Sequence, residues 1–269
     1  MKSVNRSTAD DPYELVSPLL ALADDWLALS EGANIPLELA VHELRSRGEW
    51  RLSISRTSER IEGLSVVMPG AHWYLDALRP TIAEMLSNMA VIHGRRPATL
   101  TASQEVGGWL RGFLSETGGI RAERAVKLLR CDRAPVEREG RWAADADLTA
   151  LREYEKGIDP DRLQYMDTSW EVLAAIRGLA VFTSGDLIVG SIRRYGPAPS
   201  YAAISDLFVL PDANRAEIAA RLAGFVIGEI LTRRKVVYVL VDESDVLSLA
   251  SYRHLGFEDQ GSFYRAYLE

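Results

Sequence analysis

The stretch of the sequence best suited to bind an anion is residues 203–222, AISDLFVLPDANRAEIAARL. It begins with β-branched and aromatic residues and reaches Pro211, where a strand must end because proline cannot donate to a ladder. Apolar residues then recur at three- and four-residue steps to about Thr232, which predicts a helix packed on a sheet. Free backbone N–H groups and the positive end of the dipole meet at such a helix start. The alternative is an ordinary strand–helix unit without a ligand.

Two further elements follow this stretch. Residues 236–242, VVYVLVD, predict a continuous apolar strand. Residues 245–257 predict a helix that ends at Gly256, where glycine adopts a positive φ at little cost. The order strand, loop, helix, strand, helix, with Tyr-x-x-Leu-Gly-Phe at 252–257, resembles the GNAT superfamily of acyl-CoA-dependent N-acyltransferases. The resemblance covers residues 142–269 and lies in the order of elements more than in any single motif.

The resemblance implies an α+β fold, with a mixed, mostly antiparallel sheet flanked by helices, and acetyl-CoA as cosubstrate. The strand and helix that open at Ala203 would hold the pantetheine and the diphosphate of acetyl-CoA. The residues that it assigns to binding acetyl-CoA are Leu207, Phe208, Val209, Asn214, Arg215, Ala216, Glu217, Ile218, Ala219 and Asp245.

The resemblance also assigns two catalytic roles. Tyr252 matches the tyrosine that often acts as general acid, and an acid near Asp206 receives the amine proton in related sequences. A phenol has a pKa near 10, above about 8.5 for a thiol, so proton donation by Tyr252 depends on positioning. The alternatives are that the Tyr252 ring packs in the core and that Asp206 pairs with Arg193 or Arg194 on the neighbouring strand.

The phosphate loop departs from the pattern of the superfamily, Gln/Arg-x-x-Gly-x-Gly/Ala. Counted without a gap, that pattern falls on residues 214–219, where only Ala219 fits. Glu217 places a Cβ and a negative charge where the pattern has glycine, a charge that Arg215 can partly offset. A frame shifted by one residue puts Ile218 at the glycine and loses the apolar register of the helix. These departures motivate an alternative function, a non-catalytic regulatory module or an acyl-CoA sensor.

Composition limits the function classes. The chain has 269 residues, 47% of them hydrophobic, which favours two domains. One cysteine, Cys131, excludes an intrachain disulfide. No segment approaches the roughly 20 apolar residues of a membrane span, and the polar N-terminus does not read as a signal peptide, so we expect a cytoplasmic protein. The net charge is −7 and neither half is basic, which argues against nucleic acid.

The N-terminal half repeats the order of elements of the second half. We expect two helices in residues 11–47 with a break at 33–36, a helix over 80–93, and another from a Ser103 cap to Gly118. Strands are expected at 50–55, 64–68, 72–75, 98–101 and 122–129. We therefore predict tandem GNAT-like domains, a degenerate one at 1–130 and an acyl-CoA-binding one at 131–269, divided at the charged segment 131–140.

The first copy has no loop that could cradle a phosphate between Asp76 and Pro80, so it would complete a shared sheet or wall the substrate cleft. Its histidines, His42, His72 and His93, share no metal-ligand spacing, and we expect no metal.

In the second half we expect a strand at 141–144, helices after Asp145 and over 158–176 with a cap near Ser169, and a hairpin of 178–182 with 187–195. Gly224 and Gly228 predict close packing of a helix on a sheet. The resemblance to the GNAT superfamily implies an N-acetyltransferase that moves acetyl from acetyl-CoA to the amine of a small molecule or peptide. We expect no nucleic-acid or membrane partner, and a homodimer is compatible with the sequence.

Overall fold

The structure, a computed structural model, describes residues 12–30, 34–46, 51–68, 72–92, 97–117, 119–159, 169–211 and 214–269. The chain divides into two compact units. Unit 1 comprises Met1–Val126 and Ser262–Glu269, and unit 2 comprises Lys127–Gly261. Each unit is a mostly antiparallel sheet covered by helices, which confirms the predicted fold class.

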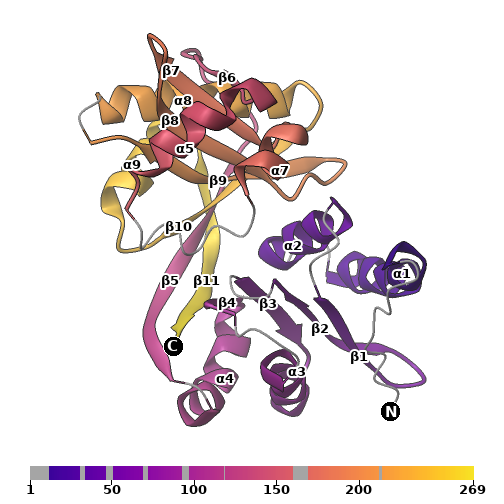
Figure 1. The fold of residues 1–269 in the computed structure, drawn as a ribbon. Coiled ribbons are helices and arrows are strands. Elements are labelled where there is room, and N and C mark those ends of the chain that lie inside the picture. Colours follow the sequence, from indigo (N-terminus) through magenta and orange to yellow (C-terminus); the bar gives the residue numbers. More distant parts are fainter. Residues whose placement is uncertain are drawn as a thin grey trace. The chain divides into compact units, whose positions relative to one another are not determined.

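The sheet of unit 1 has the strand order β1-β2-β3-β4-β11-β5 (Figure 1). Its strands are β1 (Arg51–Arg56), β2 (Ile61–Val67), β3 (His72–Ala77), β4 (Thr99–Ala102), the start of β5 (Ile120–Cys131) and the end of β11 (Glu258–Leu268). β3 and β4 pair in parallel, whereas β4 pairs with β11 antiparallel through Thr99–Ala102 and Tyr264–Tyr267. The last residues of the chain therefore belong to unit 1.

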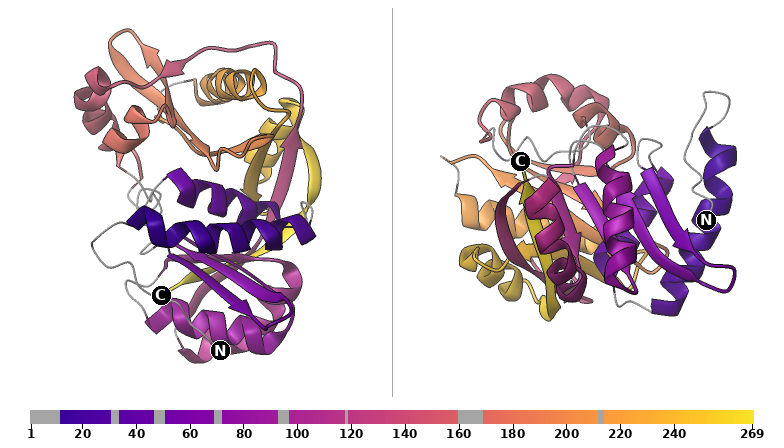
Figure 2. Two further views of the ribbon diagram at one scale, coloured as in Figure 1. Left: turned by 90° about the vertical axis from the view of Figure 1, so that its right-hand side faces the viewer. Right: turned by 90° about the horizontal axis from the view of Figure 1, so that it is seen from below.

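Helices cover both faces of the unit 1 sheet. α1 (Pro12–Ser30) and α2 (Ile35–Ser46) lie on one face, and α3 (Pro80–Ile92) and α4 (Gln104–Thr117) on the other (Figure 2). The Ser103 hydroxyl accepts from the Val106 N–H at 3.2 Å, so the predicted cap of α4 is confirmed. Fully buried apolar side chains fill the core between α3, α4 and the strands, among them Trp73, Leu75, Leu86 and Leu110.

The sheet of unit 2 has the strand order β6-β7-β8-β9-β10-β5. Its strands are β6 (Arg141–Trp142), β7 (Leu179–Ser184), β8 (Leu187–Tyr195), β9 (Tyr201–Val209), β10 (Val236–Asp242) and the end of β5. Its helical elements are η1 (Asp145–Asp147), α5 (Leu148–Glu155), α7 (Trp170–Ala175), α8 (Arg215–Leu231) and α9 (Val246–His254). β9 and β10 pair in parallel, because α8 carries the chain from the end of one back to the start of the other.

Two apolar clusters sandwich the strands of unit 2. One joins α8 and α9 to the sheet through residues such as Leu222, Val226 and Leu249. The other joins α5 and α7 to the sheet through residues such as Leu151 and Leu173. Tyr252 of α9 belongs to the first cluster, and Phe208 of β9 belongs to the second.

The sequence predicts that Gly224 and Gly228 allow α8 to pack closely on a sheet, and this prediction is wrong. A Cβ at Gly224 would overlap the backbone carbonyl oxygen of Glu137, and one at Gly228 would lie 2.8 Å from Cδ of Arg138. The segment 137–138 therefore crosses α8 at these glycines. The spacing of the glycines signals a close approach, but it cannot say which segment approaches.

Most predicted elements have a counterpart in the structure, and β11 is an element that the sequence analysis did not predict. α7 starts after Ser169, whose hydroxyl accepts from the Val172 N–H at 3.5 Å. The predictions that concern residues 1–11, 33, 47, 50, 93, 118 and 160–168 lie outside the described residues. Among the helices that are described, none is long and apolar enough to cross a membrane.

Candidate functional site

β9 carries a bulge where it passes the middle of β8. Ser191 pairs with Phe208 and Arg193 pairs with Ser205, so Asp206 and Leu207 together oppose Ile192. Asp206 has φ of 52°, a left-handed conformation that costs a residue with a Cβ about 1–2 kcal/mol. Bulges re-aim side chains and leave the extra residue out of the ladder, and strained backbone of this kind clusters at functional sites. The bulge thus indicates that Asp206 and Leu207 are candidate site residues.

The parallel ladder between β9 and β10 ends just before this bulge. It runs from Tyr201 opposite Val236 to Ile204 opposite Val239, whereas the two strands continue to Val209 and Asp242. The carboxyl ends of neighbouring parallel strands are where ligands bind in α/β sheets. Asp206 and Leu207 lie in the part of β9 that extends past the ladder.

Asp206 is held by two neighbours. Its Oδ2 accepts from the Ser205 hydroxyl at 3.0 Å and lies 3.6 Å from Nη1 of the buried Arg193. The side chain of Asp206 remains 27% exposed. The structure therefore contains the pairing with Arg193 that the sequence offers as the alternative to a role in proton transfer. A carboxylate has acceptor sites for more than these two donors, so the pairing orients Asp206 without saturating it.

Tyr252 comes from α9 and packs its ring in the core, in T-shaped contact with Phe257 at a centroid distance of 5.3 Å. Burial raises the pKa of the Tyr252 phenol, and the negative charges of Asp206 and Asp245 raise this pKa further. Both carboxylates are thus close enough to act on the phenol. A raised pKa keeps Tyr252 protonated at neutral pH, which is the state that a proton donor requires.

Asp245 caps α9. Its Oδ1 accepts from the Ser248 N–H at 3.0 Å, and its Oδ2 accepts from the Ser248 hydroxyl at 2.7 Å. These two contacts fix the first turn of the helix that carries Tyr252. Asp245 and Ser248 therefore form a matched pair at the start of α9.

A cavity of about 260 Å³ adjoins the end of β9 and the start of α8. Three of the predicted acyl-CoA residues, Phe208, Val209 and Arg215, line it, together with residues 157–159 and 210–211. Tyr154 of α5 fixes its wall, because its hydroxyl donates to the Phe208 carbonyl at 2.9 Å. Burial raises the pKa of Tyr154 to about 12, so this donor stays protonated.

The first turn of α8 is exposed at Arg215, Ala216 and Glu217, whereas Ile218 and Ala219 are half-buried. Ile218 is half-buried because it packs against β8. A Cβ at Gly190 of β8 would lie 3.3 Å from Cγ2 of Ile218. Asn214 precedes the helix without a side-chain capping bond. The N–H groups at the start of a helix have no intrahelical partner, so this turn can accept an anion.

Glu217 does not stand alone at this turn. Its Oε1 lies 2.5 Å from Nη2 of Arg221, and its Oε2 accepts from Nδ2 of Asn214 at 2.5 Å. Arg221 also donates to Glu139 at 2.8 Å. The sequence suggests Arg215 as the compensating charge, whereas the structure shows Arg221. The four-residue spacing of Glu217 and Arg221 on one helix face is the signal that predicts this contact.

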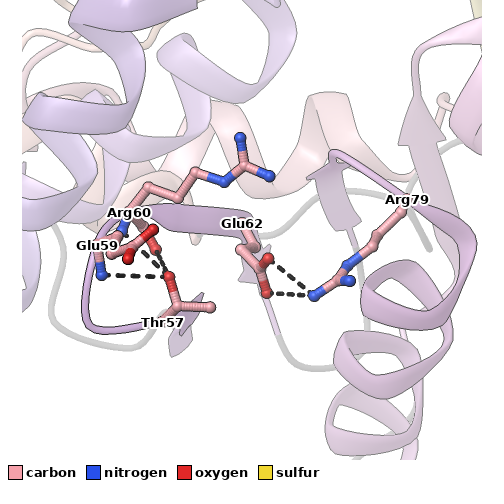
Figure 3. Close-up of polar contacts among 5 residues, drawn as sticks. All are labelled: Thr57, Glu59, Arg60, Glu62 and Arg79. Atoms are coloured by element: carbon pink, nitrogen blue, oxygen red, sulfur yellow. Dashed lines mark hydrogen bonds and ion pairs between the residues drawn. The ribbon is translucent and has the colours of Figure 1, made fainter.

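The corresponding junction of unit 1 is closed by an ion pair. Only Leu78 and Arg79 connect β3 to α3, and Pro80, the first residue of α3, has no N–H to offer. Nη2 of Arg79 lies 2.8 Å from both carboxylate oxygens of Glu62, while Thr57, Glu59 and Arg60 form the nearby turn (Figure 3). In unit 1, Arg79 at this junction pairs with Glu62 of the same unit, whereas the corresponding helix start in unit 2 is exposed.

Unit 1 also has a carboxyl group near the end of its parallel ladder. Asp76 follows Leu75, the last residue of β3 that pairs with β4. Burial raises the pKa of Asp76, while the Ala77 N–H, which donates to its Oδ1 at 3.0 Å, and the nearby polar side chains of Asn34 and Trp26 oppose that rise. Among the described residues of the chain, no group of three or more His, Cys, Asp or Glu side chains could hold a metal ion.

No known family profile and no curated protein matches this sequence. Solved structures match along the whole chain. A tandem GNAT protein from the clavulanic acid biosynthesis pathway aligns over 99% of this chain and 98% of its own at 16% identity and a TM-score of 0.60. A Drosophila protein aligns over 100% and 98% at 13% identity and a TM-score of 0.67.

A GCN5-related N-acetyltransferase from Sphaerobacter thermophilus aligns over 81% of this chain and 79% of its own, at 19% identity and a TM-score of 0.52. Structural matches at sequence identities this low establish a shared fold and nothing further. The chain has a tandem GNAT fold, as the order of its elements predicts.

Proposed function

We propose that the protein transfers an acetyl group from acetyl-CoA to an amine of a small molecule or peptide, with the reaction in unit 2. One observation carries the proposal: a protonated phenol, Tyr252, lies within electrostatic reach of a carboxylate, Asp206, that a strained bulge displays past the end of the parallel ladder. The tandem GNAT fold supports the assignment, since acetyltransferases are among the proteins that share it.

Acetyl-CoA would lie along the end of β9. The thioester and pantetheine would follow Leu207, Phe208 and Val209, where strand backbone can hydrogen-bond an extended chain. The diphosphate would meet the first turn of α8, near Arg215, which lines the adjoining cavity. Asp245 would act indirectly, because its contacts cap the helix that carries Tyr252.

The reaction requires three proton and charge movements. The amine nitrogen attacks the thioester carbonyl carbon and forms the C–N bond, and its proton passes to Asp206 directly or through water. A backbone N–H freed at the bulge stabilises the tetrahedral oxyanion. The C–S bond then breaks, and the Tyr252 hydroxyl gives its proton to the leaving thiolate. Solvent afterwards takes the amine proton from Asp206 and returns a proton to Tyr252.

A second candidate function is an acyl-CoA sensor that binds without turnover. Two observations favour it: Asp206 is already paired with Arg193, and Glu217 places a negative charge at the anion-binding turn. Incubation of acetyl-CoA with a panel of primary amines, followed by measurement of released CoA thiol, separates the two functions. Amine-dependent thiol release supports transfer, whereas binding without release supports the sensor.

Substitutions of Glu217 and Arg221 should change the affinity for CoA in opposite directions. Two unit charges about 4 Å apart repel by roughly 1 kcal/mol in water, which corresponds to about five-fold in affinity. We expect Glu217→Gly to tighten CoA binding by up to about five-fold, and Arg221→Gln to weaken it by a similar factor because it leaves Glu217 unscreened. Calorimetry with CoA and with dephospho-CoA, which keeps the diphosphate, measures both.

Dephospho-CoA should show the same two changes. If Glu217→Gly binds both ligands no more tightly than the parent does, the diphosphate does not lie over residues 214–219.

A further inference from the structure

A second concavity in unit 2 lies at the far end of α8. Four of its lining residues are arginines, Arg177, Arg194, Arg233 and Arg234, and its volume is about 50 Å³. α8 has 17 residues, so at about 1.5 Å per residue this end is roughly 25 Å from the first turn. The concavity is therefore separate from the candidate acyl-CoA site.

Neighbouring groups hold two of the guanidinium groups in place. Arg194 lies over the ring of Trp142 at 5.4 Å, and its Nη2 donates to the Ile176 carbonyl at 3.1 Å. Nε of Arg234 donates to the Ala198 carbonyl at 2.7 Å. These three contacts orient the two guanidinium groups on the wall of the concavity.

The lining carries more positive than negative charge. Its one carboxylate is Glu229, which accepts from Nε1 of Trp142 at 3.3 Å. Burial lowers the pKa of Arg234, and the charge of Arg233 lowers it further. A bound anion would relieve this repulsion. Such a concentration of positive charge is unexpected in a chain whose net charge is −7.

The backbone at Arg177 is strained where it lines this concavity. Arg177 has φ of 51° and follows α7, at a position where helices commonly end in glycine. Glycine adopts that conformation without the steric cost of a Cβ. An arginine there keeps a cation on the wall at the expense of strain, and such strain clusters at functional sites.

We propose that Arg177, Arg194, Arg233 and Arg234 form a binding site for the phosphate group of a small molecule. The volume admits one small tetrahedral anion, so the remainder of the ligand would stay outside. Phosphate carries close to two charges and several acceptor oxygens, which suits several guanidinium groups. A monocarboxylate carries one charge and two oxygens, and one arginine can satisfy it. The site does not depend on the acetyl-transfer function.

Calorimetry on the full chain at low ionic strength tests the site with inorganic phosphate, sulfate and acetate as probes. We expect phosphate and sulfate to bind saturably through the arginines tested below, and acetate not to bind at the same concentrations. Below pH 6 phosphate should bind more weakly than at pH 7.5 while sulfate does not, because only phosphate loses its second charge there.

Two variants address the arginines, and one serves as the control. Arg233→Gln should weaken phosphate binding about ten-fold, the loss of one charge-assisted hydrogen bond at a partly exposed site. Arg177→Gly should weaken it similarly and raise the melting temperature, since it relieves the backbone strain. Arg152→Gln, which changes an exposed arginine of α5 that lines neither concavity, should leave phosphate binding unchanged. Phosphate binding that neither arginine substitution weakens, or that is lost in Arg152→Gln, would overturn the proposal.

Discussion

Replacement of Tyr252 by phenylalanine is expected to lower kcat for acetyl transfer about 100-fold, the usual contribution of a positioned general acid. The fold and the affinity for acetyl-CoA should persist, because the ring that packs on Phe257 remains and only the hydroxyl is lost. Steady-state kinetics with an amine that releases thiol in the panel measure kcat. Tyr201→Phe, at the opposite end of β9, is the matched control and should turn over like the parent.

The pH dependence of the parent gives an independent check on Tyr252. Its pKa lies above the ordinary value near 10, so the phenol stays protonated as the pH rises through 8 and 9. Because a donor acts only while it is protonated, kcat should show no fall below about pH 10. A descending limb near pH 8 in the parent that is absent in Tyr252→Phe would mean that the Tyr252 phenol ionises near pH 8, so that its pKa is not raised. Equal turnover of Tyr252→Phe and the parent would reduce the ring to a packing role.

The largest expected effect on stability comes from Gly224→Ala. A Cβ at this position meets the backbone carbonyl oxygen of Glu137, which cannot move without displacing the segment that crosses α8. We expect the free energy of unfolding to fall by about 1–3 kcal/mol, the usual cost of overpacking. The gain in helix propensity, up to about 1 kcal/mol, offsets only part of this cost.

Gly228→Ala is the matched control in the same helix. The added Cβ there meets Cδ of Arg138, part of a flexible side chain that can turn aside. Its cost and the gain in helix propensity should nearly cancel. Denaturant titrations of the two variants and the parent make the comparison, and equal stability of the two variants would contradict the crossing at Gly224.

The path from β9 through α8 to β10 could be predicted from the sequence because each element carries its own periodicity. The apolar run up to Val209, the stop at Pro211 and the four-residue steps of α8 are local signals. The bulge carries no such signal, since Asp206 and Leu207 alternate like any strand residues. It depends on the pairing of β9 with β8, which is a non-local property.

Membership of the last residues in unit 1 is likewise non-local. Tyr264 pairs with Ala102, and its hydroxyl donates to Glu123 at 2.7 Å, across separations that no sequence window covers. The contact of Glu217 with Arg221 could be predicted from the sequence, because the two residues stand one helical turn apart. The sequence offers the pairing of Arg193 with Asp206 as one alternative, and the structure contains this pairing.

Calorimetry of acetyl-CoA with the parent and with Arg215→Glu measures whether unit 2 binds acetyl-CoA across the end of β9 and the start of α8. Arg215 is exposed and lines the cavity at the helix start, so reversing its charge opposes a diphosphate there with little disturbance of the core. We predict one site per chain in the parent and binding at least about ten-fold weaker in the variant, since two changes of roughly 1 kcal/mol add. Absence of binding to the parent, or equal affinity in the two proteins, would contradict an acetyl-CoA site at the end of β9 and the start of α8.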